Sequence, residues 1–133
     1  MALALLLCPA PVIAQDLIFL GETHDNPGHH ARQAQWVEDL QPNALVFEML
    51  TPAQADLITP ALIADMGAME TALGWAGSGW PDFSMYHPIF AAMPSAVILG
   101  AAVPREDARR MMSEPVQDVF GPDAGRFGLD RAL

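Results

Sequence analysis

The segment Leu17-Ile18-Phe19-Leu20-Gly21-Glu22-Thr23-His24-Asp25-Asn26-Pro27-Gly28-His29-His30 places two acids, an amide and three of the chain's four histidines directly after a short apolar run. The apolar run predicts a buried strand, Gly21 lets the backbone turn, and Asn26-Pro27 is typical of a helix N-cap followed by the first helical residue. The polar residues therefore lie on a loop between a strand and a helix. In open α/β sheets, ligands bind beside such loops at the carboxyl ends of the strands.

The residues after this loop complete a unit of strand, helix and strand. Helical spacing places five residues on one face: His29, Gln33, Trp36, Val37 and Leu40. We expect the Trp36 to Leu40 end of this face to pack on the sheet and the His29 end to meet the loop of Glu22 and His24. His30 lies about a quarter turn away from that face, and exposure to solvent is one of its alternatives. A second apolar run, Ala44 to Phe47, ends in Glu48, and a right-handed crossover would put Glu48 beside Glu22.

The composition excludes one class of partner. The chain has 133 residues, is 52% hydrophobic and carries a formal net charge of -10 at pH 7. It is long enough for one hydrophobic core, but its six Lys and Arg residues do not supply the basic footprint that phosphate contacts need. We therefore expect no nucleic-acid partner.

The first fourteen residues, Met1 to Ala14, are almost wholly apolar and end in a small-residue pattern typical of signal-peptide cleavage. We interpret residues 1–14 as a signal peptide cut before Gln15, with a buried first strand as the alternative. The run is shorter than the ~20 apolar residues that span a bilayer. Cys8 is the only cysteine, so no internal disulfide forms. Its setting after Leu7 resembles a lipoprotein acylation box, so a lipid anchor is the alternative to a plain exported protein.

Turn residues and apolar spacing divide the remaining chain into short elements. The expected elements are a helix from Thr51-Pro52 interrupted at Pro60, a glycine-rich aromatic loop over Leu73–Phe83, a helix over Pro88–Met93, a third strand over Ala96–Ala101 and a polar helix over Arg105–Met112. From Glu114 onward, no periodicity is visible. The expected organisation is a signal peptide at 1–14, one domain at 15–113 and an irregular tail at 114–133.

Two blocks of residues carry a resemblance to a known family. The first block runs from Gly21 to Pro27 with His29, His30 and Gln33, and continues in Phe47-Glu48-Met49. The second block runs from Leu73-Gly74-Trp75 through Ser78-Gly79-Trp80-Pro81-Asp82 to Tyr86, Pro88-Ile89-Phe90 and Val103-Pro104-Arg105. With these blocks the chain resembles the ChaN-type haem-binding uptake proteins, within the wider group of TIKI proteases and erythromycin esterases.

The resemblance implies an α/β fold with a short, mainly parallel sheet flanked by helices, as the N-terminal half of a three-layer family fold. It also implies an exported protein of the periplasm or outer-membrane surface that binds haem, forms a homodimer on haem binding and works with an outer-membrane haem receptor. Family members are commonly much longer than this chain, and they usually carry an Asn where this chain has Ala102. We therefore expect an incomplete fold with an exposed sheet edge.

Haem ligation through a tyrosine is what the resemblance suggests, and Tyr86 is the only tyrosine. A phenolate suits ferric haem because it is a hard anionic donor. His87 could be a second ligand or a hydrogen-bond partner, and the aromatic loop with Trp80 offers rings against which a porphyrin could lie. The alternative is that Tyr86 only packs against that loop.

Two other interpretations of the loop cluster stay open. In a metal-dependent hydrolase, four residues could hold zinc or manganese or form an acid-base pair: Glu22, His24, His29 and Glu48. No Ser or Cys nucleophile stands beside the histidines and no His-Glu-x-x-His helix is present, which disfavours an enzyme. In a structural brace, Glu22 pairs with His24 while Asp25 and Asn26 cap the helix. We predict the haem-binding protein and keep the hydrolase as the alternative.

Overall fold

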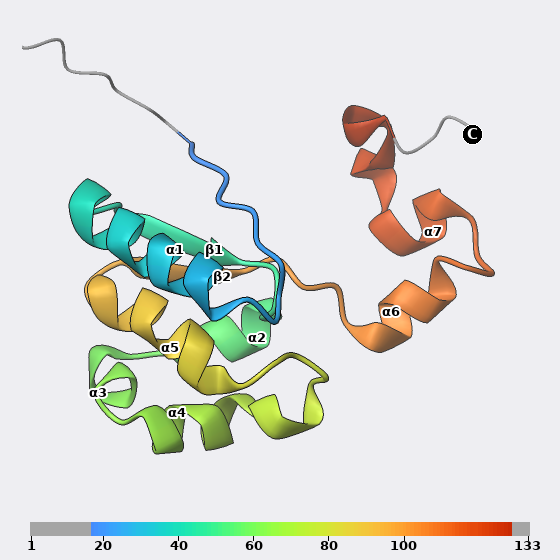
Figure 1. Ribbon diagram of the computed structural model, residues 1–133. Helices are drawn as coiled ribbons and strands as arrows, with labels where there is room; N and C mark the ends of the chain where they lie inside the picture. Colours follow the sequence, from blue (N-terminus) through green and yellow to red (C-terminus); the bar gives the residue numbers. More distant parts are fainter. Residues whose placement is uncertain (1–16, 129–133) are drawn as a thin grey trace, which may run out of the picture.

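A computed structural model describes residues 17–128 of the chain. The expected signal peptide, its cleavage step and Cys8 lie outside the described residues. Among the helices in the described range, none is long and apolar enough to cross a membrane. Figure 1 shows a body made of helices and a small sheet, with the C-terminal helical segment set to one side of it.

The sheet consists of two parallel strands, β1 (Ala44–Phe47) and β2 (Val97–Gly100). Their register sets the first residues of the two strands opposite each other, and the chain between them crosses over through helices, as parallel pairing requires. Both strands lie where the sequence predicts them. The fold is mixed α/β with a parallel sheet packed against helices, which confirms the expected fold class.

Side chains alternate across this sheet. Phe47 is buried under the helices, whereas Val46, Val97 and Leu99 point to the opposite face and are exposed. Within residues 17–128, helices therefore cover one face of the sheet and leave the apolar side chains of the other face in contact with solvent.

The segment Leu17–Leu20 is not a strand, so that prediction is wrong. The side chains of Leu17 and Phe19 are 67% and 87% exposed. The Leu20 carbonyl accepts a hydrogen bond from the Gln33 side chain at 3.2 Å instead of from a neighbouring strand. An apolar run gives a preference for extended structure, but strand formation depends on the neighbour that lies alongside.

Helix α1 spans Pro27–Leu40 as predicted, and the Asn26 side chain caps it by accepting a backbone N–H of the first turn at 2.9 Å. A capping box between Thr51 and Gln54 starts the next helical stretch, which Pro60 divides as expected. The resulting short helices are α2 (Pro52–Ala55), α3 (Pro60–Ile63) and α4 (Met66–Leu73).

Helix α5 (Phe83–Ala92) begins well before the predicted helix at Pro88. Its N-cap is Asp82, whose carboxylate accepts from the backbone N–H of Ser84 at 2.8 Å. The prediction treated Pro88 as a first helical residue, a position that proline favours, whereas the helix carries it in its interior. Tyr86 therefore belongs to a helix and follows the aromatic loop, in which a short 3-10 helix, η1 (Trp75–Gly77), forms.

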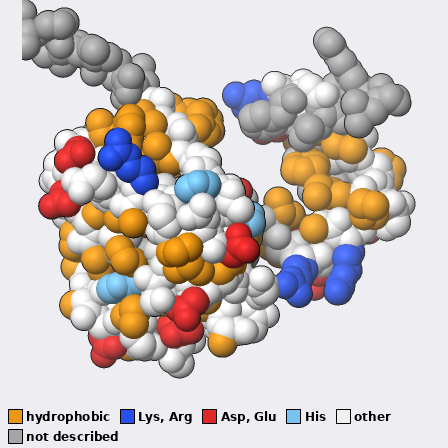
Figure 2. Space-filling model, in the orientation of Figure 1, with side chains coloured by type: hydrophobic (Ala, Val, Ile, Leu, Met, Phe, Trp, Pro, Cys, Tyr) orange, Lys and Arg blue, Asp and Glu red, His pale blue; other side chains and the backbone are white. Residues whose placement is uncertain are grey.

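The C-terminal part contains three short helical elements. Helix α6 spans Arg105–Arg110, within the predicted range, and α7 (Val116–Phe120) and the 3-10 helix η2 (Pro122–Phe127) follow it. Helices of five and six residues are too short to produce a visible periodicity, so the sequence did not indicate them. Figure 2 shows hydrophobic side chains gathered over this part of the chain, and Met112 and Phe120 are among the exposed ones.

The core lies between the sheet and the helices, with side chains from α1, α3, α4 and α5. Its largest fully buried side chains are Tyr86, Phe83, Phe90, Leu50, Met69 and His30. Phe47 of β1 stacks on Phe90 of α5 with 4.0 Å between ring centroids, and burial of one such side chain contributes about 1.5–3 kcal/mol. At the end of β2, a Cβ on Gly100 would collide with two backbone carbonyl oxygens, so this close approach requires glycine.

Helix α1 turns a different face inward from the predicted one. His30 and Val37 are buried, whereas His29 is exposed and Trp36 is 39% exposed. The prediction packed the Trp36 to Leu40 end of α1 on the sheet, but α1 packs mainly against α5. The predicted contact of His29 with the loop is present, because its ring accepts the backbone N–H of Thr23. One residue corresponds to about 100° around a helix, and this rotation exchanges His29 for His30 at the interior.

Candidate functional site

The Glu22 carboxylate is the centre of a polar cluster between the loop that precedes α1 and the helix α5. The side chain of Glu22 is 5% exposed. Its Oε1 lies 2.9 Å from His24 Nδ1 and accepts from the Tyr86 hydroxyl at 3.1 Å. The predicted contact of Glu22 with His24 is therefore present, and Tyr86 joins it from 64 residues further along the chain.

His30 closes the cluster from below and is fully buried. Its Nε2 lies 2.8 Å from the backbone carbonyl of His24; a carbonyl only accepts, so Nε2 carries the hydrogen. Its Nδ1 lies 3.0 Å from Glu22 Oε2, although the two atoms are not aligned as a hydrogen bond and have no other partner among the described residues. The sequence did not determine whether His30 is exposed or buried. It is buried because α1 packs on α5.

Tyr86 lies beneath the loop and is fully buried. Its hydroxyl donates to Glu22 and lies 3.3 Å from the His24 carbonyl oxygen. The ring lies between those of His30 and Trp75, at centroid distances of 4.2 Å and 4.9 Å. Burial, and after it the negative charge of Glu22, raises the pKa of the Tyr86 phenol well above its ordinary value. In this conformation the phenol is a hydrogen-bond donor that holds the loop.

The two other residues predicted with Tyr86 go to different places. Trp80 lies at the surface of the cluster, with its ring edge-on to that of His24 at 4.7 Å. His87 points elsewhere: its Nε2 lies 2.8 Å from the Ile63 carbonyl at the end of α3. Successive helical residues lie about 100° apart, so Tyr86 and His87 serve different sides of α5.

Three of the four predicted metal ligands lie together. One donor atom from each of Glu22, His24 and Glu48 falls within a group whose members are all within 4.8 Å of one another. His24 Nε2 is 3.8 Å from Glu48 Oε1, and these side chains are 48% and 61% exposed. The fourth predicted ligand, His29, does not join them, because its Nδ1 accepts the backbone N–H of Thr23 at 2.9 Å.

The remaining motif residues have local roles. Asn26 caps α1 as predicted, and Asp25 is exposed beside it. Gly21 is not in the left-handed region, and a Cβ there would meet no atom within 4 Å, so the turn itself doesn't require glycine. Gln33 ties α1 to Leu20, while its Oε1 is buried without a partner among the described atoms.

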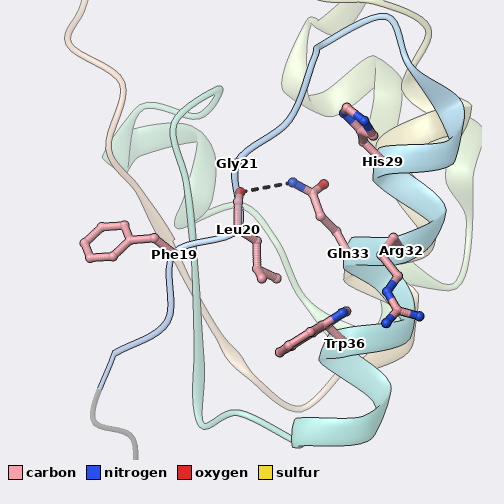
Figure 3. Close-up of a pocket in the computed structure, with 7 residues that line it drawn as sticks. All are labelled: Phe19, Leu20, Gly21, His29, Arg32, Gln33 and Trp36. Carbon is pink, nitrogen blue, oxygen red and sulfur yellow. Dashed lines mark hydrogen bonds between the residues drawn. The ribbon is translucent and has the colours of Figure 1, made fainter.

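A shallow cavity of about 290 Å³ lies between the segment that precedes α1 and α1 itself. Its lining residues are Phe19, Leu20, Gly21, His29, Arg32, Gln33 and Trp36. Figure 3 shows Gln33 reaching across it from α1 to Leu20, with Trp36 below and the ring of Phe19 directed away from the helix. The Arg32 guanidinium lies 5.8 Å from the Trp36 ring, so the cation of this cavity already has an aromatic contact.

Comparison with known proteins gives one match. The family model described as haem-binding uptake, Tiki superfamily, ChaN, matches residues 10–133, which is most of the chain. No match was found among the curated proteins or among the solved structures.

Proposed function

Because the chain belongs to the haem-binding uptake family of the Tiki superfamily, the ChaN family, we propose that it binds haem and serves in haem or iron uptake at the cell envelope. Family membership is the observation that carries this proposal. Haem is the ligand that the family description names, and it supplies a ferric iron with an axial position for a protein donor.

The residues around Glu22 fit such a group. A haem site needs a donor that reaches solvent, a ring or apolar side chain against the porphyrin, and a cation for a propionate. His24 is half exposed with the ring of Trp80 beside it. Arg105 contacts the aromatic loop that carries Trp80, since its Nη2 donates to the Ser78 carbonyl at 2.6 Å. Among residues 17–128 it has no carboxylate partner within 4.0 Å. The predicted ligand Tyr86 lies directly beneath His24.

Export, periplasmic or outer-membrane location, and homodimer formation on haem binding are parts of the same proposal. The apolar run of residues 1–14 supports export. The exposed apolar side chains on the open face of the sheet, Val46, Val97 and Leu99, are a surface that a second chain could cover. An outer-membrane haem receptor is the protein partner that we propose for the uptake role.

Titration of the purified protein with haemin, followed by absorbance, tests the proposal. We expect a Soret shift that saturates at a fixed ratio of haem to protein, and a sedimentation shift toward dimer on loading. A Soret band that grows without saturation, as for haemin in an unrelated acidic protein, would count against haem binding.

A metal-dependent hydrolase remains the second candidate, favoured by the proximity of donor atoms from Glu22, His24 and Glu48. Imidazole and carboxylate ligands together suit zinc or manganese. Elemental analysis of protein purified without chelators, with a Glu48→Ala variant as the comparison, tests this candidate. Stoichiometric zinc or manganese that the variant loses would support it, and metal-free protein that does not take up either ion would exclude it.

A further inference from the structure

Resting on the proposed haem binding, we infer that Nε2 of His24, and not the oxygen of Tyr86, is the ligand to the haem iron in this protein. Tyr86 and His30 are then positioning residues that act through Glu22 and through the backbone of the loop. Two observations support this: the position of the hydrogen on each histidine ring, and the full burial of the Tyr86 and His30 side chains.

His24 has the tautomer that an iron ligand needs. Its Nδ1 lies 2.9 Å from a carboxylate oxygen of Glu22, which only accepts, so in the neutral ring Nδ1 carries the hydrogen and Nε2 keeps its lone pair. The side chain of His24 is half exposed, and its Nε2 lies 3.8 Å from Oε1 of the exposed Glu48. A carboxylate behind the ring is the usual support of a metal-bound imidazole, because it fixes the orientation and raises the basicity of the ring.

The other three histidines do not offer an Nε2 lone pair to a ligand at the surface. His29 accepts the Thr23 N–H at Nδ1, so in the neutral ring its Nε2 carries the hydrogen. His87 directs Nε2 at the Ile63 carbonyl, and His30 directs Nε2 at the His24 carbonyl while fully buried. Of the chain's four histidines, all within the described residues, His24 alone presents Nε2 as a donor to a ligand at the surface.

Tyr86 is placed as a support for His24. Its side chain has no exposed surface, and its hydroxyl is directed at Glu22 and at the His24 carbonyl, so a porphyrin reaches its oxygen only if the loop is lifted away. His30 holds the same carbonyl from another side at 2.8 Å. Both residues thus fix the backbone and the carboxylate that orient the His24 ring.

The experiment compares ferric haem in the parent protein with His24→Gly, with His29→Gly as the matched control, by magnetic circular dichroism and resonance Raman spectroscopy. We expect an imidazole-ligand signature in the parent and in His29→Gly, and its loss in His24→Gly. Added imidazole should restore the signature in His24→Gly, because the space left by the side chain admits the free ligand.

A Tyr86→Phe variant completes the test, because it keeps the ring and removes the hydroxyl. We expect it to retain the imidazole signature and to bind haemin about 10–100-fold more weakly, the usual effect of losing a residue that supports a ligand. A phenolate-to-iron charge-transfer band in the parent that Tyr86→Phe abolishes and His24→Gly retains would overturn the inference. An unchanged spectrum in His24→Gly would overturn it as well. Absence of saturable haem binding in the parent would instead overturn the proposed function, and the inference with it.

Discussion

Replacement of Glu22 by Ala is expected to destabilise the protein even without a ligand, because this carboxylate is the partner of several buried groups. Its Oε1 accepts from the Tyr86 hydroxyl at 3.1 Å, and its Oε2 lies 3.0 Å from Nδ1 of the buried His30. A buried donor or acceptor that loses its partner costs about 1–3 kcal/mol. The Tyr86 hydroxyl keeps the His24 carbonyl at 3.3 Å as a second acceptor, and Glu22 Oε2 and His30 Nδ1 share no hydrogen bond that the substitution could remove. The expected loss of stability is therefore about 1–3 kcal/mol.

Glu48→Ala is the matched control for Glu22→Ala. Both substitutions remove one carboxylate close to His24, but the side chain of Glu48 is 61% exposed and that of Glu22 is 5% exposed. A surface substitution of this kind changes the free energy of unfolding by about 0.5 kcal/mol or less. The difference between the variants therefore measures burial of the Glu22 carboxylate and not the loss of a charge.

Urea denaturation of the ligand-free protein, followed by the fluorescence of the three tryptophans, is a suitable assay. The two variants and the parent should share one m value and differ in the midpoint, so that the shift reports stability alone. In thermal unfolding, a loss of about 1 kcal/mol in a domain of this size lowers Tm by roughly 4–8 °C. If Glu22→Ala and Glu48→Ala unfold at the same urea concentration, Glu22 is not the buried centre of the cluster, and the placement of Tyr86 and His30 around it is refuted.

Three further outcomes are expected. Gly100→Ala should destabilise the protein by about 1–3 kcal/mol because the new Cβ overlaps two backbone carbonyl oxygens, whereas Gly21→Ala should be close to neutral; equal urea midpoints for the two variants would contradict this. Arg105→Gln should weaken haemin binding several-fold without changing the ligand signature, which titration and Raman spectra would show, since we assign it to a propionate; an unchanged affinity would exclude that role. Intact-mass analysis of the exported protein should give a chain that begins at Gln15, and a mature species that retains Met1 would exclude cleavage.

Local signals in the sequence were sufficient to predict helix α1 and the strands β1 and β2. Asn26-Pro27 fixes the start of α1 because the cap and the first helical residue are neighbours in the chain. The apolar runs that became β1 and β2 were recognisable for the same reason. Glu48 does lie close to His24, but the crossover from a strand at Leu17–Leu20 that predicted their proximity does not exist, because that segment is not a strand.

The features that the sequence did not predict depend on packing between residues far apart in the chain. Leu17–Leu20 has the pattern of a strand, but its pairing depends on a partner that the pattern does not name. Both faces of α1 near its start carry a histidine, so only the contact with α5 places His30 inside and His29 outside. The Tyr86 hydroxyl reaches Glu22 across 64 residues, and no local signal distinguishes a phenol that supports a ligand from one that is the ligand.

The geometry of the His24 ring bears on the choice between haem and a divalent ion. Glu22 contacts Nδ1, whereas the free lone pair is on Nε2, so the carboxylate and the open donor lie on different sides of one imidazole. An ion at Nε2 would therefore find Glu48 nearby but would gain Glu22 only if the contacts of its carboxylate with His24 and Tyr86 were broken. Catalytic zinc sites use three protein ligands, whereas haem iron already has four ring nitrogens and needs one axial donor from the protein. The single oriented imidazole of His24, beside the indole ring of Trp80, therefore suits haem iron better than a catalytic zinc ion.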